Sequence, residues 1–302
     1  MTAINIQNLT KDYGNHKGIF DVSFQIEEGE VVGFLGPNGA GKTTTIRHLL
    51  GFSKPQSGTA AVLQLNCWNE SKEIQKHLGY LPAEMAFPEN MTGTQLIQHT
   101  AKMRGLRDLK RSQQLIEMFN LDSSAPIKRM SKGMKQKVGI VCAFMHDPKV
   151  LILDEPTTGL DPLMQSVFVQ LIREEKQKGK SILMSSHLFE EIEGTCDRIA
   201  MIKQGKIISV IKAQEFNNVE KTTFKVTFQN PEDFQSIQHD IFKISEIHKE
   251  GLQLVIEIKD TQLNDLIRAL AAKNVISIRE MKYSLEDNFM NFYRGENHDH
   301  VQ

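Results

Sequence analysis

A glycine-rich stretch, GPNGAGKTT at positions 36–44, carries residue types that could bind phosphate. It follows an apolar run at 31–35 that predicts a buried strand, and it precedes a segment at 46–50 with helical spacing. In this context the backbone amides of such a loop surround an anion at the N-terminus of a helix. Side chains at Gly36, Gly39 and Gly41 would hold the backbone away from the phosphates. The alternative is a glycine turn followed by a surface lysine.

The side chains of this loop predict a nucleotide and a magnesium ion. We expect Lys42 to reach the β- and γ-phosphates of ATP and the Thr43 hydroxyl to bind Mg²⁺. The predicted nucleotide-binding residues of the loop are Gly36, Pro37, Asn38, Gly39, Ala40, Gly41, Lys42, Thr43 and Thr44.

Two adjacent carboxylates, Asp154 and Glu155, end a second apolar run at 150–153. The run predicts a buried parallel strand, and α/β sheets bind their ligands at the carboxyl ends of such strands. We expect Asp154 to hold Mg²⁺, directly or through water, and Glu155 to polarise the attacking water. His187 follows another predicted strand at 181–185 and is a candidate sensor of the γ-phosphate, although a structural role is the common one for such a histidine.

Tyr13 and the helix start at Ser131 and Gly133 each have both a functional and a structural interpretation. Tyr13 lies in a polar loop, where its ring either stacks on adenine or is an ordinary surface side chain. Ser131 is a good N-cap for a helix that begins the stretch SKGMKQK. Gly133 is costly inside that helix, so it indicates either the close approach of another group or a loose first turn.

The predicted elements describe an α/β domain followed by a smaller α+β domain. Alternating segments at 4–9 and 22–26 predict an N-terminal antiparallel part, and helical spacing predicts a helical insert at about 84–148 within a domain spanning 1–215. After a polar stretch at 211–221, residues 222–302 read as β-α-β-β-α-β, the split βαβ order, with a final helix near 284–294.

The composition narrows the functional classes. The net charge of −1 argues against a nucleic-acid binder that works through bulk positive charge. The three cysteines form no CxxC pair, and no metal-binding spacing is present. The N-terminus shows no secretion signal, and no apolar run approaches the ~18–20 residues of a membrane span. If the protein works at a membrane, another chain must supply the span.

Together these stretches resemble the ATP-binding subunit of an ABC transporter over about residues 2–215. GPNGAGKTT resembles the family's Walker A loop, and LILDE resembles Walker B with its catalytic glutamate at Glu155. The GLD sequence at 159–161 is similar to the D-loop, which implies a role near the nucleotide for Asp161. Tyr13 and His187 fall at the adenine-stacking and switch-histidine positions. The resemblance implies the ABC-type P-loop NTPase fold, with a mixed sheet and a helical insert.

Two motifs depart from the family pattern. The signature loop, usually LSGGQ, is MSKGM at 130–134, which keeps Ser131 and Gly133 but has Lys132 in place of a glycine. Lys132 either adds a cation near the γ-phosphate or points to solvent. The Q-loop glutamine is replaced by Ala83, and the following Glu84 is a candidate Mg²⁺ ligand. This variant signature and the small C-terminal domain resemble the exporter branch that handles antimicrobial peptides, drugs and similar amphiphiles.

The resemblance implies a head-to-tail dimer with two ATP molecules, each between Walker A of one copy and the signature of the other. The second ATP-binding subunit would be an identical or a different chain. An integral membrane subunit would contact the insert near 84–91, which implies a peripheral location at the cytoplasmic face of the membrane. Two alternatives remain: a soluble ABC-type ATPase acting on nucleic acid or ribosomes, and a slow nucleotide-dependent regulatory switch.

Overall fold

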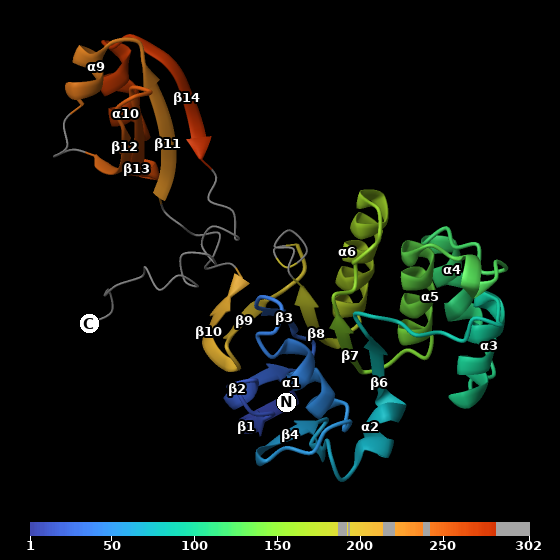
Figure 1. The fold of residues 1–302 in the computed structure, drawn as a ribbon. Helices are drawn as coiled ribbons and strands as arrows, with labels where there is room; N and C mark the ends of the chain where they lie inside the picture. Colours follow the sequence, from blue (N-terminus) through green and yellow to red (C-terminus); the bar gives the residue numbers. More distant parts are fainter. Residues whose placement is uncertain (187–191, 193, 214–220, 238–241, 282–302) are drawn as a thin grey trace. The chain divides into compact units, whose positions relative to one another are not determined.

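The computed structural model describes residues 1–186, 192, 194–213, 221–237 and 242–281. The chain divides into two compact units, Met1–Ala213 and Gln214–Gln302 (Figure 1). No helix within these described stretches is long and apolar enough to cross a membrane.

A six-stranded sheet forms the centre of the first unit, in the order β10-β9-β3-β8-β7-β6. All neighbouring strands are parallel except β9 and β10. The central strands β3, β7 and β8 are buried at every residue, as their continuous apolar runs predict. Their carboxyl ends therefore place the loops that follow them side by side. The strands are β3 (Val31–Leu35), β6 (Leu78–Leu81), β7 (Val150–Asp154), β8 (Ser181–Ser186), β9 (Arg198–Lys203) and β10 (Lys206–Lys212).

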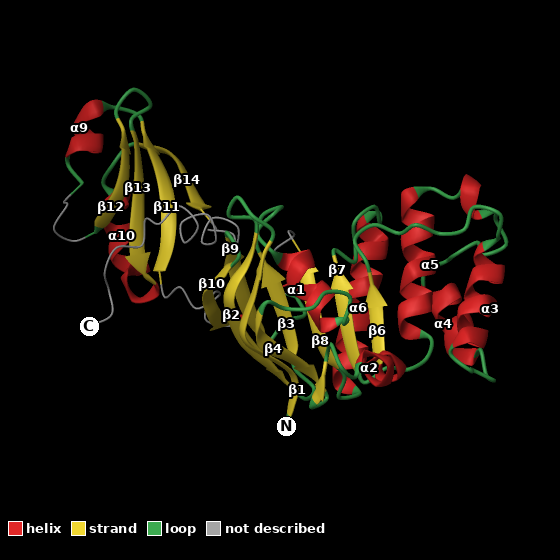
Figure 2. Ribbon diagram, turned by 60° about the horizontal axis from the view of Figure 1, so that its bottom comes forward, coloured by secondary structure: helices red, strands yellow, loops and turns green. Residues whose placement is uncertain are grey.

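An antiparallel sheet in the order β2-β1-β4-β5 packs against this layer through a common core. Ile46 and Leu49 of α1 (Lys42–Leu49) belong to the same core as apolar residues of β1 and β3. Figure 2 shows α1 beside these strands. The strands are β1 (Thr2–Asp12), β2 (Gly18–Glu27), β4 (Ser57–Val62) and β5 (Leu65–Asn66).

The helical insert lies beyond the edge strand β6 in both views (Figures 1 and 2). A short helix that the sequence analysis did not anticipate, α2 (Ser71–His77), precedes β6. Ser131 caps α5 as predicted, by accepting a hydrogen bond from the amide of Met134 at 3.2 Å. The insert contains α3 (Gly93–Met103), α4 (Lys110–Met118), the 3-10 turn η1 (Ile127–Arg129) and α5 (Lys132–Phe144).

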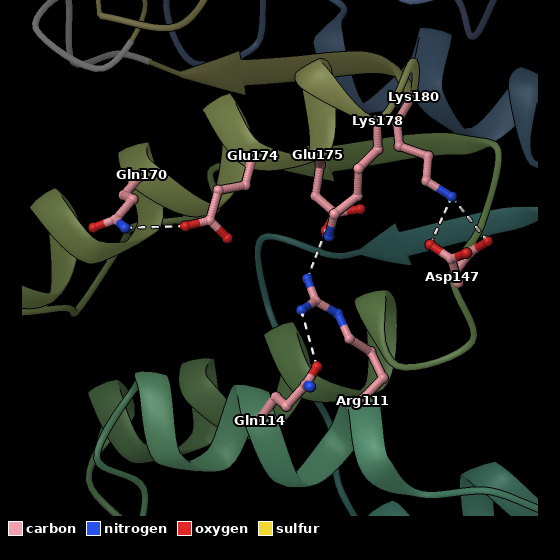
Figure 3. A network of polar contacts seen from close by, with 8 residues as sticks. All are labelled: Arg111, Gln114, Asp147, Gln170, Glu174, Glu175, Lys178 and Lys180. Atoms are coloured by element: carbon pink, nitrogen blue, oxygen red, sulfur yellow. Dashed lines mark hydrogen bonds and ion pairs between the residues drawn. The ribbon is translucent and has the colours of Figure 1, made fainter.

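A polar network joins the insert to α6 (Pro162–Gln177) (Figure 3). Arg111 of α4 forms an ion pair of 2.5 Å with Glu175 of α6, whose side chain is buried. Lys178 lies 2.8 Å from the same carboxylate. Because a buried carboxylate is costly without a partner, this contact disfavours separation of α4 from α6.

The second unit is a four-stranded antiparallel sheet in the order β12-β13-β11-β14. This is the strand order of the predicted split βαβ arrangement. Leu266 and Leu270 of α10 are part of a core that also contains Val226 and Phe228 of β11. The predicted helix near 284–294 lies outside the described residues. The elements are β11 (Lys221–Phe228), α9 (Pro231–Gln235), β12 (Lys243–His248), β13 (Gln253–Lys259), η2 (Asp260–Gln262), α10 (Leu263–Ala271) and β14 (Val275–Met281).

Candidate nucleotide-binding site

A cleft of about 500 Å³ lies in the first unit. The loop after β3, the carboxyl end of β7 and the loop between β1 and β2 all contribute to it. The glycine-rich loop and the two carboxylates therefore meet, as the sequence predicted. The lining residues are Tyr13, Lys17, Gly18, Pro37, Asn38, Gly39, Gly41, Lys42, Thr43, Thr44, Ala83, Asp154 and Glu155.

Glycine is required at positions of this loop for two different physical reasons. Gly39 and Gly41 have φ angles of 80° and 116°, which side-chain-bearing residues rarely adopt. An added Cβ on Gly36 would lie 2.5 Å from the carbonyl oxygen of Ile202. Gly36 therefore must be small for a reason other than the predicted approach of the phosphates: a larger residue would collide with Ile202. Gly41 is also the N-cap of α1 and provides no side-chain cap, which leaves the first turn suited to an anion.

Lys42 extends back along the loop that precedes it. Its Nζ donates hydrogen bonds to the carbonyl oxygens of Gly36 and Pro37, the latter at 3.3 Å. Burial lowers the pKa of Lys42, while the carboxylates of Glu155 and Asp154 oppose that shift. The site thus holds a buried ammonium group beside a helix N-terminus, a combination that fits the phosphates of a nucleotide.

Asp154 is buried and accepts hydrogen bonds from hydroxyl groups on two other elements. Thr43 Oγ1 donates to its Oδ2 at 3.0 Å, and Ser185 Oγ donates to its Oδ1. Hydroxyl and carboxylate oxygens are hard ligands of the type that Mg²⁺ prefers, so Thr43 and Asp154 fit that ion. Ser185 was not among the predicted site residues. Parallel pairing of β7 with β8 sets Asp154 opposite Ser185, and two polar residues at the end of an apolar strand were the available signal.

Glu155 begins the loop after β7 with a left-handed φ of 48°. Its amide donates to the carbonyl oxygen and to the Oγ of Ser185, at 3.1 Å each. Thr158 Oγ1 donates to its carboxylate at 3.3 Å. These contacts hold a carboxylate at the cleft, where it could orient water. His187, the other predicted catalytic residue, lies outside the described residues.

Tyr13 lies at the edge of the cleft with 56% of its surface exposed. Lys11 Nζ lies 5.8 Å from the centroid of its ring. An exposed aromatic face next to a phosphate-type loop can stack on a base. Lys17 of the same loop and Gly18 at the start of β2 also line the cleft and were not among the predicted site residues.

The remaining candidates do not line the cleft. Ser131 and Asp161 are exposed N-caps of α5 and α6, and Asp161 Oδ1 accepts from the amide of Met164 at 3.0 Å. Gly133 packs close to Gly159. Glu84 is exposed, and the neighbouring Ala83 lines the cleft in its place. The structure therefore does not support the prediction that Glu84 is a Mg²⁺ ligand.

Known proteins resemble this chain over one or both units. The family model described as ABC transporter matches residues 19–158. An uncharacterized ABC transporter ATP-binding protein of Bacillus subtilis, YhcH, is 32% identical over 100% of this chain and 99% of its own length. The bacitracin transport ATP-binding protein BcrA of Bacillus licheniformis is 34% identical over 97% of this chain and 98% of its own.

A solved structure, described as the ATP-binding subunit of an ABC transporter, superposes with a TM-score of 0.67 at 31% identity. The superposition covers 71% of this chain and 92% of the solved chain. The similarity to these relatives over the full chain and the phosphate loop with paired carboxylates in the cleft point to the same family. The chain therefore belongs to the ABC transporter ATP-binding proteins and is an ATPase subunit of such a transporter.

Proposed function

We propose that this chain powers an exporter of peptides, drugs or similar amphiphiles. The observation that carries the nucleotide chemistry is the cleft in which Thr43, Asp154 and Glu155 lie together. Similarity to the bacitracin transport protein over nearly the whole chain supports a cargo of that kind. The relatives that share both units are transporter proteins, which favours this function over an ATPase that acts on nucleic acid or ribosomes.

In the proposed mechanism the loop amides and Lys42 bind the phosphates, and Tyr13 stacks on adenine. Thr43 and Asp154 hold Mg²⁺, which when bound offsets the negative charge of the phosphates. Glu155 orients and polarises the attacking water from its anchored position after β7. His187 would contact the γ-phosphate. Glu84 is left out, since Ala83 lines the cleft.

A second ATP-binding subunit would complete the site. Ser131, Gly133 and Asp161 lie away from the cleft of their own chain and would face the nucleotide of the other copy in a head-to-tail dimer. The N-terminal end of α5 adds a favourable dipole for that phosphate. The insert near 84–91 would contact an integral membrane subunit. The chain would then lie peripherally at the cytoplasmic face of the membrane. This function involves no nucleic-acid partner.

Glu155→Gln tests the site. The amide keeps the size of the carboxylate but cannot polarise water, so the variant should bind ATP, lose steady turnover and accumulate as a dimer with ATP. Size-exclusion chromatography and a phosphate-release assay measure both properties. Glu28→Gln, at an exposed turn, is the control and should behave as the unmodified protein. A Glu155→Gln protein that stays monomeric with ATP would contradict the dimer.

Affinity purification of the tagged protein from solubilised membranes tests the transporter assignment. We expect a multi-span membrane protein in stoichiometric amount, and its cavity would then define the cargo. Recovery of ribosomal or nucleic-acid partners without a membrane protein would refute the exporter.

A further inference from the structure

The first turns of α5 are bonded to the loop that carries Glu155. The Gln136 side chain is 1% exposed, and its Nε2 donates a hydrogen bond of 2.6 Å to the carbonyl oxygen of Pro156. The same nitrogen lies 3.5 Å from the carbonyl oxygen of Glu155. Because both acceptors are carbonyls, the amide nitrogen and not the amide oxygen must face them. A buried hydrogen bond therefore connects α5 to the chain immediately after β7.

A second contact joins the same two segments. A Cβ added to Gly133 would lie 2.5 Å from the carbonyl oxygen of Gly159, so the two backbones are in close contact. A Cβ added to Gly159 would lie 3.0 Å from Cγ and 3.2 Å from Cδ of Lys132. The aliphatic stem of Lys132 therefore covers Gly159, a role that neither sequence-based interpretation of this residue included.

The loop between these two contacts is held by its own hydrogen bonds. The amide of Thr158 donates to the carbonyl oxygen of Glu155 at 3.2 Å, and the amide of Leu160 donates to that of Thr157 at 2.9 Å. Thr158 Oγ1 also donates to the Glu155 carboxylate. Hydrogen bonds and close contacts thus run without a break from Glu155 along this loop to Gly159 and on to α5.

We propose that Gln136 is a positioning residue that couples the two ATP sites of the dimer. The inference rests on the proposed function, in which Glu155 serves the nucleotide of its own chain and Ser131 with Gly133 serves that of the other copy. The Gln136–Pro156 bond makes α5 and the 155–160 loop move together. The nucleotide state at one site therefore changes the position of the α5 end presented to the other site.

Gln136→Met tests the coupling because methionine retains the length of the side chain and lacks the donor. ATP affinity of the monomer should stay within about twofold, whereas turnover should fall about tenfold or more. The Hill coefficient of ATP hydrolysis should exceed one in the unmodified protein and fall toward one in the variant. Gln113→Met, which removes an exposed glutamine of α4, is the matched control and should change neither quantity. Unchanged turnover and Hill coefficient in Gln136→Met would overturn the proposal.

Hydrogen–deuterium exchange of the unmodified protein gives a second test that does not depend on folding of the variant. ADP is added at a concentration where the chain is monomeric, and exchange is followed in peptides covering 155–160 and 131–137. We expect protection of both segments to change together. A change confined to 155–160 would show that α5 does not follow the loop. In folded Gln136→Met, the response of 131–137 should disappear while that of 155–160 persists.

The two proposals fail in different ways. Continued ATP turnover by Glu155→Gln would overturn the assignment of the site itself. A Glu155→Gln protein that forms the ATP-dependent dimer, together with Gln136→Met that keeps its Hill coefficient, would overturn only the coupling.

Discussion

Several buried polar groups of the first unit are satisfied by hydrogen bonds to other elements. Asp154 receives hydroxyl donors from Thr43 and Ser185, and Gln136 donates to Pro156. The amide of Glu155 bonds to the strand next to its own. A buried polar group that loses its partner costs about 1–3 kcal/mol, so these residues combine stability with the geometry of the site.

His146 makes the stability of the first unit depend on pH. Its Nε2 lies 3.1 Å from the carbonyl oxygen of Leu78, to which the neutral ring donates. Its buried Nδ1 has no hydrogen-bond partner in the part of the chain that the structure describes. Burial, followed by the charge of Arg104, lowers the pKa of His146 to about 4. In the unfolded chain His146 is protonated as the pH falls through about 6.5, whereas in the folded protein it stays neutral until the pH approaches 4.

The contribution of His146 is complete above pH 6.5 and is lost as the pH falls toward 4, by up to about 3 kcal/mol. Urea unfolding at pH 7.5 and 4.5 should show a larger loss for the unmodified protein than for His146→Gln. The glutamine amide can still donate to Leu78 and does not titrate. Equal losses in the two proteins would contradict this role for His146.

At the scale of the elements, side-chain caps define where two of the insert helices, α3 and α5, begin. Thr92 Oγ1 accepts from the amide of Gln95 at 3.2 Å, and the Gln95 side chain accepts from the amide of Thr92 at 2.9 Å. This reciprocal capping box satisfies two amides that the helix α3 cannot bond internally.

Thr92→Ala should lower the free energy of unfolding by about 1 kcal/mol, because the amide of Gln95 loses its acceptor. Urea denaturation at neutral pH measures the difference. Thr92→Ser retains the hydroxyl and should stay within about 0.5 kcal/mol of the unmodified protein. An equal loss in both variants would point to the methyl group of Thr92 instead of the cap.

At the scale of the whole molecule, each unit has a core cluster of its own. Among the residues that the structure describes, those that line the nucleotide cleft all lie before residue 214. These observations support the proposal of an ATP-binding domain over about 1–215 and a small accessory domain over 222–302. Units of this size can bury enough apolar surface to fold alone.

A chain ending at Ala213 should therefore fold and bind ATP with an affinity within about twofold of the full protein, since it keeps all the described residues that line the cleft. Calorimetric titration with ATP measures this affinity, and circular dichroism confirms that the shortened chain is folded. Lys42→Ala in the same shortened chain is the control and should abolish binding. A folded chain without ATP affinity would show that the second unit contributes to the site.

The sequence alone was enough to predict the phosphate loop and the pair Asp154–Glu155, which lie in one cleft of the structure. These signals are local: glycine spacing, a lysine and a hydroxyl at a helix start, and carboxylates that end a continuous apolar run. The order of elements in the second unit was also predictable, since elements such as β13 and α10 carry their own hydrophobic period and α9 begins with a proline. The short helix α2 escaped prediction because only one of its residues, Ile74, is buried, which leaves too weak a period.

Only the tertiary structure decided which residues support that chemistry. Ser185 reaches Asp154 because β8 lies parallel to β7, and Gln136 reaches Pro156 because α5 packs on the loop after β7. Ala83 lines the cleft, whereas its neighbour Glu84 is exposed. The Ser185 and Gln136 contacts join residues far apart in the chain, so spacing along the sequence does not show which residues they pair.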